Sequence, residues 1–139
     1  MIQRIQSVWL LLAAVLAFIT FRFPFYIGGV LITTGTVNNT ELNATTTILL
    51  TILTILSGAT AFAAIFLFEN RKLQLKVCIC GIIFTALLLF TYFMQLKNFE
   101  SGMFALSCIF HFGILAFYIL AIRAIRKDEK LIKSLDRLR

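Results

Sequence analysis

Proline and charged residues are scarce in this sequence, and each shortage excludes a class of protein. The 139 residues include 1 Pro and 7 Gly, which excludes a collagen-like or linker-rich chain. Only 14% of the residues are charged, whereas a soluble domain carries about 25%. The hydrophobic share of 60% excludes intrinsic disorder and exceeds the roughly 45–50% of soluble domains. We therefore predict an integral membrane protein with a single domain over residues 1–139.

Four long apolar stretches dominate the chain. A helix needs about 20 mostly apolar residues to span a membrane. The predicted fold class is all-α: a four-helix transmembrane bundle with an amphipathic cytoplasmic C-terminal helix, the tail at residues 123–139. The predicted spans are residues 8–26, 47–68, 77–96 and 103–122.

Lys and Arg are divided unequally between the two sides of such a bundle. An even number of spans puts both termini on one side, together with the loop at residues 69–76. Of the 13 Lys and Arg residues, only Arg22 and Lys97 fall on the other side. By the positive-inside rule, we expect both termini and the middle loop in the cytoplasm. The aromatic run at residues 21–26 favours a retained first span over a cleaved signal peptide.

Ionisable residues are almost missing from the apolar stretches. None of these stretches contains a carboxylate, which disfavours a proton pump that uses Asp or Glu within the membrane. The one deep candidate is His111, expected about 12 Å inside the fourth stretch. Helical spacing places Ser107 and Tyr118 on the same stripe, with Thr54 of the second stretch as a partner. This group is either a proton relay or polar ligand site, or a hydrogen-bonded packing contact, which we favour. Other hydroxyls expected near His111 belong to Ser57, Thr60, Thr85 and Thr91.

The three cysteines do not indicate redox or metal chemistry. Cys78 and Cys80 are two residues apart, so they do not share a helix face. We expect Cys108 roughly 15–20 Å away along the membrane normal. No Ser/His/Asp set, carboxylate pair or phosphate loop is visible either. We therefore expect no cofactor, no metal and no enzymatic activity.

The tail combines helical periodicity with many Lys and Arg residues. Its apolar residues Ile125, Leu131, Leu135 and Leu138 are expected to form one face. The tail either lies along the inner leaflet, with its cations at anionic headgroups, or docks in a groove of a partner protein. No aromatic residues interleave the cations, which disfavours nucleic-acid binding. The candidate contacts to partner or headgroup are Arg123, Arg126, Lys127, Asp128, Glu129, Asp136 and Arg137, with Arg71 and Lys72 of the middle loop.

Three segments carry a resemblance to a known family. They are MIQRIQSVWLLLAA at residues 1–14, FLFENRKLQ at residues 66–74 and LAIRAIRKDEKLIKSLDRLR at residues 120–139. The last is the most specific. Together they resemble domain of unknown function family 4293 over the whole chain. The resemblance implies a small four-span inner-membrane protein of Bacteroidota with both ends in the cytoplasm, and it implies no activity.

These observations support two functional hypotheses. The first is a non-catalytic accessory or scaffold subunit of a larger membrane complex, because the chain is small, has short loops and ends in a distinctive tail. The alternative is a small oligomeric transporter or a lipid- or quinone-binding membrane protein that uses the His111 stripe. The expected partners are membrane lipids and either a larger membrane protein or further copies of this chain.

Overall fold

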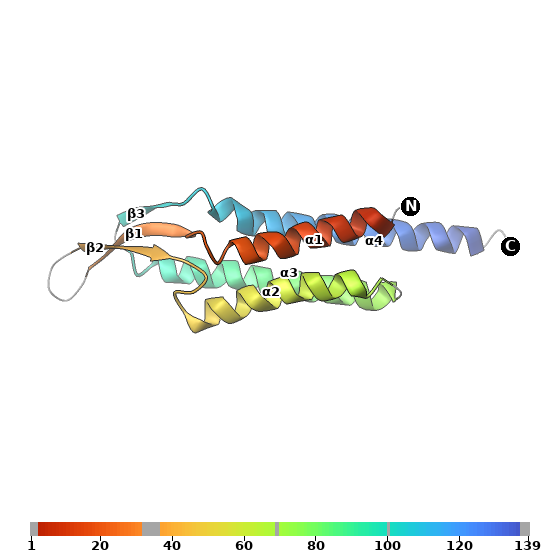
Figure 1. The fold of residues 1–139 in the computed structure, drawn as a ribbon, viewed down its shortest axis with the longest axis horizontal. Helices are drawn as coiled ribbons and strands as arrows, with labels where there is room; N and C mark the ends of the chain where they lie inside the picture. The colour runs from red at the N-terminus through yellow and green to blue at the C-terminus, as the bar shows by residue number, and fades with distance from the viewer. Residues whose placement is uncertain (1–2, 32–36, 69, 100, 137–139) are drawn as a thin grey trace.

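Four helices lie lengthwise beside one another, and a small sheet covers one end of the bundle (Figure 1). The computed structural model describes residues 3–31, 37–68, 70–99 and 101–136, with side chains for 5–29, 40–68, 70–99 and 101–132. The start of α1 and the end of α4 lie at the end opposite the sheet. The helices are α1 (Gln3–Ile19), α2 (Ile48–Phe66), α3 (Arg71–Leu96) and α4 (Cys108–Asp136).

Three of these helices, α2, α3 and α4, are long and apolar enough to cross a membrane. Helix α1 has a shorter apolar stretch, Ile5–Ile19. The chain is therefore a mostly helical membrane protein. The first span was expected to reach residue 26, but α1 ends at Ile19. The chain turns there, well before Pro24, and the Thr20 hydroxyl donates a 2.7 Å hydrogen bond to the Ala17 carbonyl.

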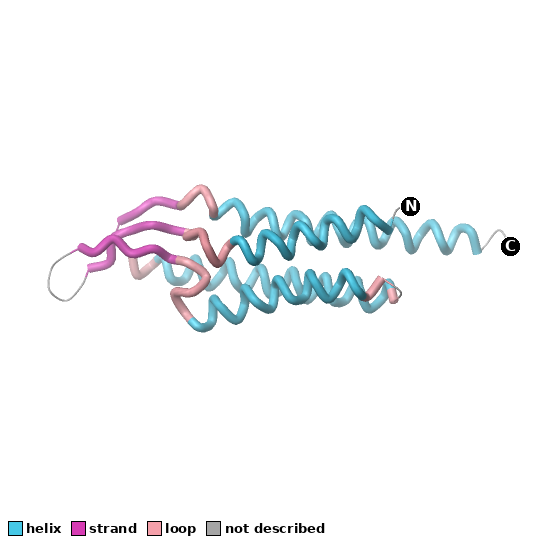
Figure 2. Tube along the Cα trace, in the orientation of Figure 1, coloured by secondary structure: helices cyan, strands magenta, loops and turns pink. Residues whose placement is uncertain are grey.

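The sheet was not expected from the sequence. Its three antiparallel strands are β1 (Tyr26–Leu31), β2 (Val37–Leu42) and β3 (Ser101–Phe104), in the order β2-β1-β3 (Figure 2). The predicted start of the fourth span at residue 103 is wrong as a helix start, because Ser101–Phe104 pairs with β1 and α4 begins only at Cys108. Hydropathy alone does not distinguish a short apolar strand from the start of the helix that follows it, so the prediction assigns this segment to the span.

Gly28 and Gly102 are directly opposite each other in β1 and β3. A Cβ added at Gly28 would lie 2.5 Å from the Ser101 carbonyl oxygen and 2.8 Å from a ring carbon of Tyr26. Real side chains do not tolerate such distances, so only glycine permits this close strand approach. The Tyr26 ring covers the two glycines and also packs against Phe99 and Phe104.

The helices pack closely where small residues face each other. Ala17 of α1 meets Gly58 of α2, where an added Cβ would lie 3.3 Å from the Ala17 Cβ. The Tyr118 ring of α4 lies directly on Gly81 of α3. Small residues four apart, such as Ala13 with Ala17 and Thr54 with Gly58, let helices approach closely. The burial of Ala13 and Ala17 agrees with this packing. A second apolar cluster, next to the sheet, consists of Phe25, Leu42, Leu50, Leu53, Leu88, Leu89 and Tyr92.

Helix α4 continues without a break from the apolar segment into the tail. It stays in line with the bundle and reaches beyond the ends of α2 and α3 (Figure 1). The described part of the tail therefore does not bend away to lie along a leaflet. Ile125 and Leu131 also do not share one apolar face as expected, because Ile125 is fully buried whereas Leu131 is 43% exposed. Six helical residues turn a side chain by about 240°, so these two point in different directions. Of the other two, the side chain of Leu135 and all of Leu138 lie outside the described part.

Candidate functional site

His111 lies in the first turn of α4, under the sheet, and is 1% exposed. The Phe25 ring meets it edge-on at a centroid distance of 5.2 Å, and the Tyr92 ring does so at 4.9 Å. Neither ring nitrogen makes a hydrogen bond of normal geometry to any residue that the structure describes. The backbone of Cys108 lies one turn earlier and interacts with the His111 ring, but not with the geometry of a normal hydrogen bond. His111 is thus closer to the end of its helix than the sequence predicts, because α4 starts late.

The hydroxyls expected around His111 bond elsewhere. Thr54 donates to the Leu50 carbonyl at 2.8 Å, Thr85 to the Gly81 carbonyl at 2.8 Å, and Thr91 to the Leu87 carbonyl at 2.8 Å. Each of these carbonyls lies one turn earlier on the same helix, which is a common way to satisfy a hydroxyl in an apolar helix. Ser107 donates to the Pro24 carbonyl and so joins the start of α4 to the segment before β1.

Tyr118 forms a polar bridge between two helices. Its hydroxyl donates a 2.6 Å hydrogen bond to the Ser57 carbonyl of α2, and it lies 2.9 Å from the Thr60 hydroxyl. The side chain is fully buried, so these bonds satisfy a polar group that burial would otherwise penalise. The hydroxyls of Ser107, Tyr118 and Thr54 therefore bond to groups other than the His111 ring.

Tyr92 is the residue that sequence reasoning missed. Its ring is fully buried and stacks on Phe25 at a centroid distance of 4.4 Å. Its hydroxyl, like the His111 nitrogens, makes no hydrogen bond to the part of the chain that the structure describes. The sequence could have indicated Tyr92 by its helical spacing, because it lies four residues after Leu88 and seven after Thr85, on the buried face of α3.

A second polar cluster joins three helices at the opposite end of the bundle. Asp128 of α4 is only 4% exposed and accepts a hydrogen bond from the Gln6 side chain of α1. An Arg71 Nη of α3 lies 3.3 Å from the same carboxylate. Nearby, the Gln74 side chain donates a 3.0 Å hydrogen bond to the Ala64 carbonyl of α2. We call Gln6, Arg71 and Asp128 the clamp, because together they tie α1 and α3 to α4.

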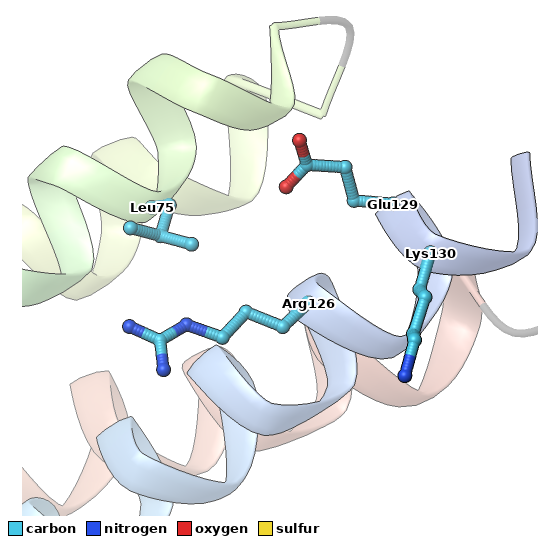
Figure 3. A pocket seen from close by; sticks show the side chains of 4 residues that line it. All are labelled: Leu75, Arg126, Glu129 and Lys130. Carbon is cyan, nitrogen blue, oxygen red and sulfur yellow. The ribbon is translucent and has the colours of Figure 1, made fainter. Parts of the chain in front are cut away.

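The remaining tail residues divide by their position around α4. Arg123, Arg126, Lys127 and Lys130 are exposed, as is Lys72 on α3. Leu75, Arg126, Glu129 and Lys130 line a shallow groove between α3 and α4, which we call the α3–α4 groove (Figure 3). Arg137 lies outside the described residues, and Asp136 ends α4 with a side chain that is not described.

The cysteines stay separate in the fold. Cys78 is buried, Cys80 is exposed, Cys108 is half-buried, and all three are free thiols. Within the described residues, no group of three or more His, Cys, Asp or Glu side chains is placed to hold a metal ion.

Fold and contacts together define a small helical membrane protein in which buried polar side chains connect neighbouring helices. Comparison with known families is more specific. The sequence matches Domain of unknown function (DUF4293) over residues 2–138, so the chain belongs to this family. The match confirms the resemblance carried by the three segments. The comparison with curated proteins gives no match.

Proposed function

We propose that this chain is a non-catalytic accessory subunit of a larger membrane-protein assembly, held in the inner membrane by four spans with both termini in the cytoplasm. Three apolar helices support membrane insertion directly. Helix α1 supports a fourth span, because its 17 residues extend about 26 Å and it packs between α4 and α2. The bilayer core is about 30 Å thick, so the segment leading to the sheet completes the crossing.

The distribution of cations supports the proposed orientation. Lys72 and Lys76 of α3 lie near the end at which α4 terminates, together with the exposed cations of α4. Arg22 and Lys97 lie near the sheet. Cytoplasmic ends of membrane helices carry an excess of Lys and Arg, so the sheet faces the other side of the membrane.

The single observation that carries the accessory role is the far part of α4. The helix extends past α2 and α3, and there it presents Leu131 and Ile132, each 43% exposed. These side chains follow Arg123, Arg126, Lys127 and Lys130 in the sequence. Such cations mark the cytoplasmic surface of a membrane, so we place Leu131 and Ile132 outside the lipid tails. Apolar side chains held on a projecting helix in water are typical of a helix that docks in a partner's groove.

A photo-crosslinking experiment at native expression level tests this role. A photoreactive residue at Ile132 is expected to give one stoichiometric adduct with a larger membrane protein. The same residue at Phe112, 49% exposed in the apolar part of α4, is expected to give lipid adducts. Changing Leu131 and Ile132 together to Ser should abolish co-purification of that partner. The matched control Leu73→Ser, at a side chain 48% exposed at the same end of α3, should retain it. A chain that purifies alone, or a partner that survives the double change, would overturn the proposal.

The alternative, a small transporter or a lipid- or quinone-binding protein, depends on His111. One observation favours it: His111 and Tyr92 are adjacent buried polar groups without hydrogen-bond partners among the described residues. Such a site would need further copies of the chain, because four short helices do not enclose a path by themselves. Loss of activity in a His111→Leu variant that still assembles would support the alternative over the accessory role.

A further inference from the structure

The α3–α4 groove combines an apolar floor with a cationic rim. Leu75 contributes from α3, and Arg126, Glu129 and Lys130 contribute from α4. Figure 3 shows the Arg126 side chain extended toward Leu75 and the Glu129 carboxylate turned toward the ends of α2 and α3. The Lys130 side chain points away from both and forms the outer rim. Lys72 is exposed three residues before Leu75, so it shares that face of α3 and lies on the same side of the groove.

The charges around the groove leave a net positive balance. Arg71 is paired with the buried Asp128 in the clamp, so that acid does not neutralise the groove. Glu129 also has an interaction within the protein. Three cations, Arg126, Lys130 and Lys72, are thus balanced by one carboxylate, so a ligand with negative charge fits this surface.

The groove lies at the level where both helices change from apolar to cationic. On the apolar side, α3 presents Ile79 and Ile83 and α4 presents Ile119, with exposed fractions of 39%, 51% and 45%. Immediately beyond come the Lys and Arg residues of each helix. A ligand here therefore needs an anionic head at the membrane surface and an apolar part that continues along α3 and α4.

We propose that the α3–α4 groove binds one anionic phospholipid, with its phosphate at Arg126, an acyl chain against Leu75 and Lys130 as a second cation at the rim. The Arg fork matches two phosphate oxygens at once, and Lys adds a compact charge. Basic pockets between membrane helices bind anionic headgroups in this way. The site is distinct from the docking element of the proposed function, Leu131 and Ile132, so each hypothesis fails separately.

Lipid titration of the purified, delipidated chain in an uncharged detergent tests the proposal. Native mass spectrometry counts the bound molecules of palmitoyl-oleoyl-phosphatidylglycerol, and phosphatidylcholine with the same acyl chains is the comparison. We expect one saturable phosphatidylglycerol site. Changing Arg126 and Lys130 together to Gln should weaken it about twenty-five-fold, since each cation near a membrane surface contributes about a factor of five.

The matched control changes Arg123 and Lys127 together to Gln. It removes the same charge from exposed positions on the same helix but outside the groove, and we expect less than about a threefold effect. Exchanging the two groove cations as Arg126→Lys with Lys130→Arg should restore most of the affinity. Equal weakening by both charge pairs, equal binding of phosphatidylcholine, or full displacement of the lipid by inorganic phosphate would each overturn a specific lipid site.

Discussion

Replacing Asp128 with Ala should destabilise the bundle, because this carboxylate joins three helices. The carboxylate is 4% exposed, and it is the acceptor for both Gln6 and Arg71. A hydrogen bond to a charged group contributes about 1.5–3 kcal/mol. The Arg71 side chain is 19% exposed, so the ion pair adds only about 1 kcal/mol. We expect Asp128→Ala to lower the free energy of unfolding by about 3 kcal/mol. Asp128→Asn, which keeps an acceptor oxygen for Gln6, should lower it by about 1 kcal/mol.

The chain contains a natural probe for this experiment. Trp9 is its only tryptophan, three residues after Gln6, and stacks on Phe117 of α4 at a centroid distance of 5.7 Å. Its fluorescence during titration with a denaturing detergent therefore reports the separation of α1 from α4. Lys127→Ala, at an exposed neighbour, is the control and should stay within about 0.5 kcal/mol of the wild type. The reasoning is refuted if Asp128→Ala costs no more than this control, or if Arg71→Gln and Asp128→Asn are additive in a double-mutant cycle.

Three further changes test the other contacts by the same unfolding assay or by hydrogen exchange. Tyr118→Phe removes the hydroxyl that bonds to the Ser57 carbonyl, and it should cost about 1 kcal/mol; an unchanged midpoint would show that this bridge does not stabilise the bundle. His111→Leu removes no hydrogen bond of normal geometry to the described residues and should stay within about 1 kcal/mol of the wild type, whereas a much larger loss would reveal a polar partner. Gly28→Val places side-chain atoms against the Ser101 carbonyl, so the amides of β3 should exchange faster while α2 and α3 keep their protection; unchanged exchange in β3 would contradict the close strand approach.

Hydropathy was sufficient to predict the long helices. The second predicted span, 47–68, differs from α2 by no more than two residues at either end, and the third ends with α3 at Leu96. Its predicted start at residue 77 is wrong as a helix start, because the residues from Arg71 to Lys76, expected in the middle loop, form the first turns of α3. Long apolar runs have few structural alternatives in a membrane, so their length alone determines the element. The spacing of small residues indicates close helix packing, but it does not say which helices meet, so the contact of Ala17 with Gly58 comes from the structure alone.

The sheet and the clamp could not be predicted in this way because both depend on residues far apart in sequence. Gly28 pairs with Gly102, and Gln6 bonds to Asp128 across 122 positions. Neither pairing leaves a periodic signal in its own segment. The surroundings of His111 were missed for a related reason: its neighbour Phe25 comes from the segment before β1, which was expected to be the end of a helix.

The polar contacts at the two ends of the bundle restrict which part of the chain can respond to a ligand or partner. At the sheet end, the Gln95 side chain donates a 2.8 Å hydrogen bond to Thr47 and so ties α3 to the start of α2. At the other end, the clamp ties α4 to α1 and α3, and Gln74 ties α3 to α2. Moving any of these helices breaks a buried polar contact. A lipid in the α3–α4 groove or a partner on Ile132 therefore meets a preformed surface. Trp9 fluorescence, which reports the contact between α1 and α4 inside the clamped region, should consequently stay constant while phosphatidylglycerol saturates its site.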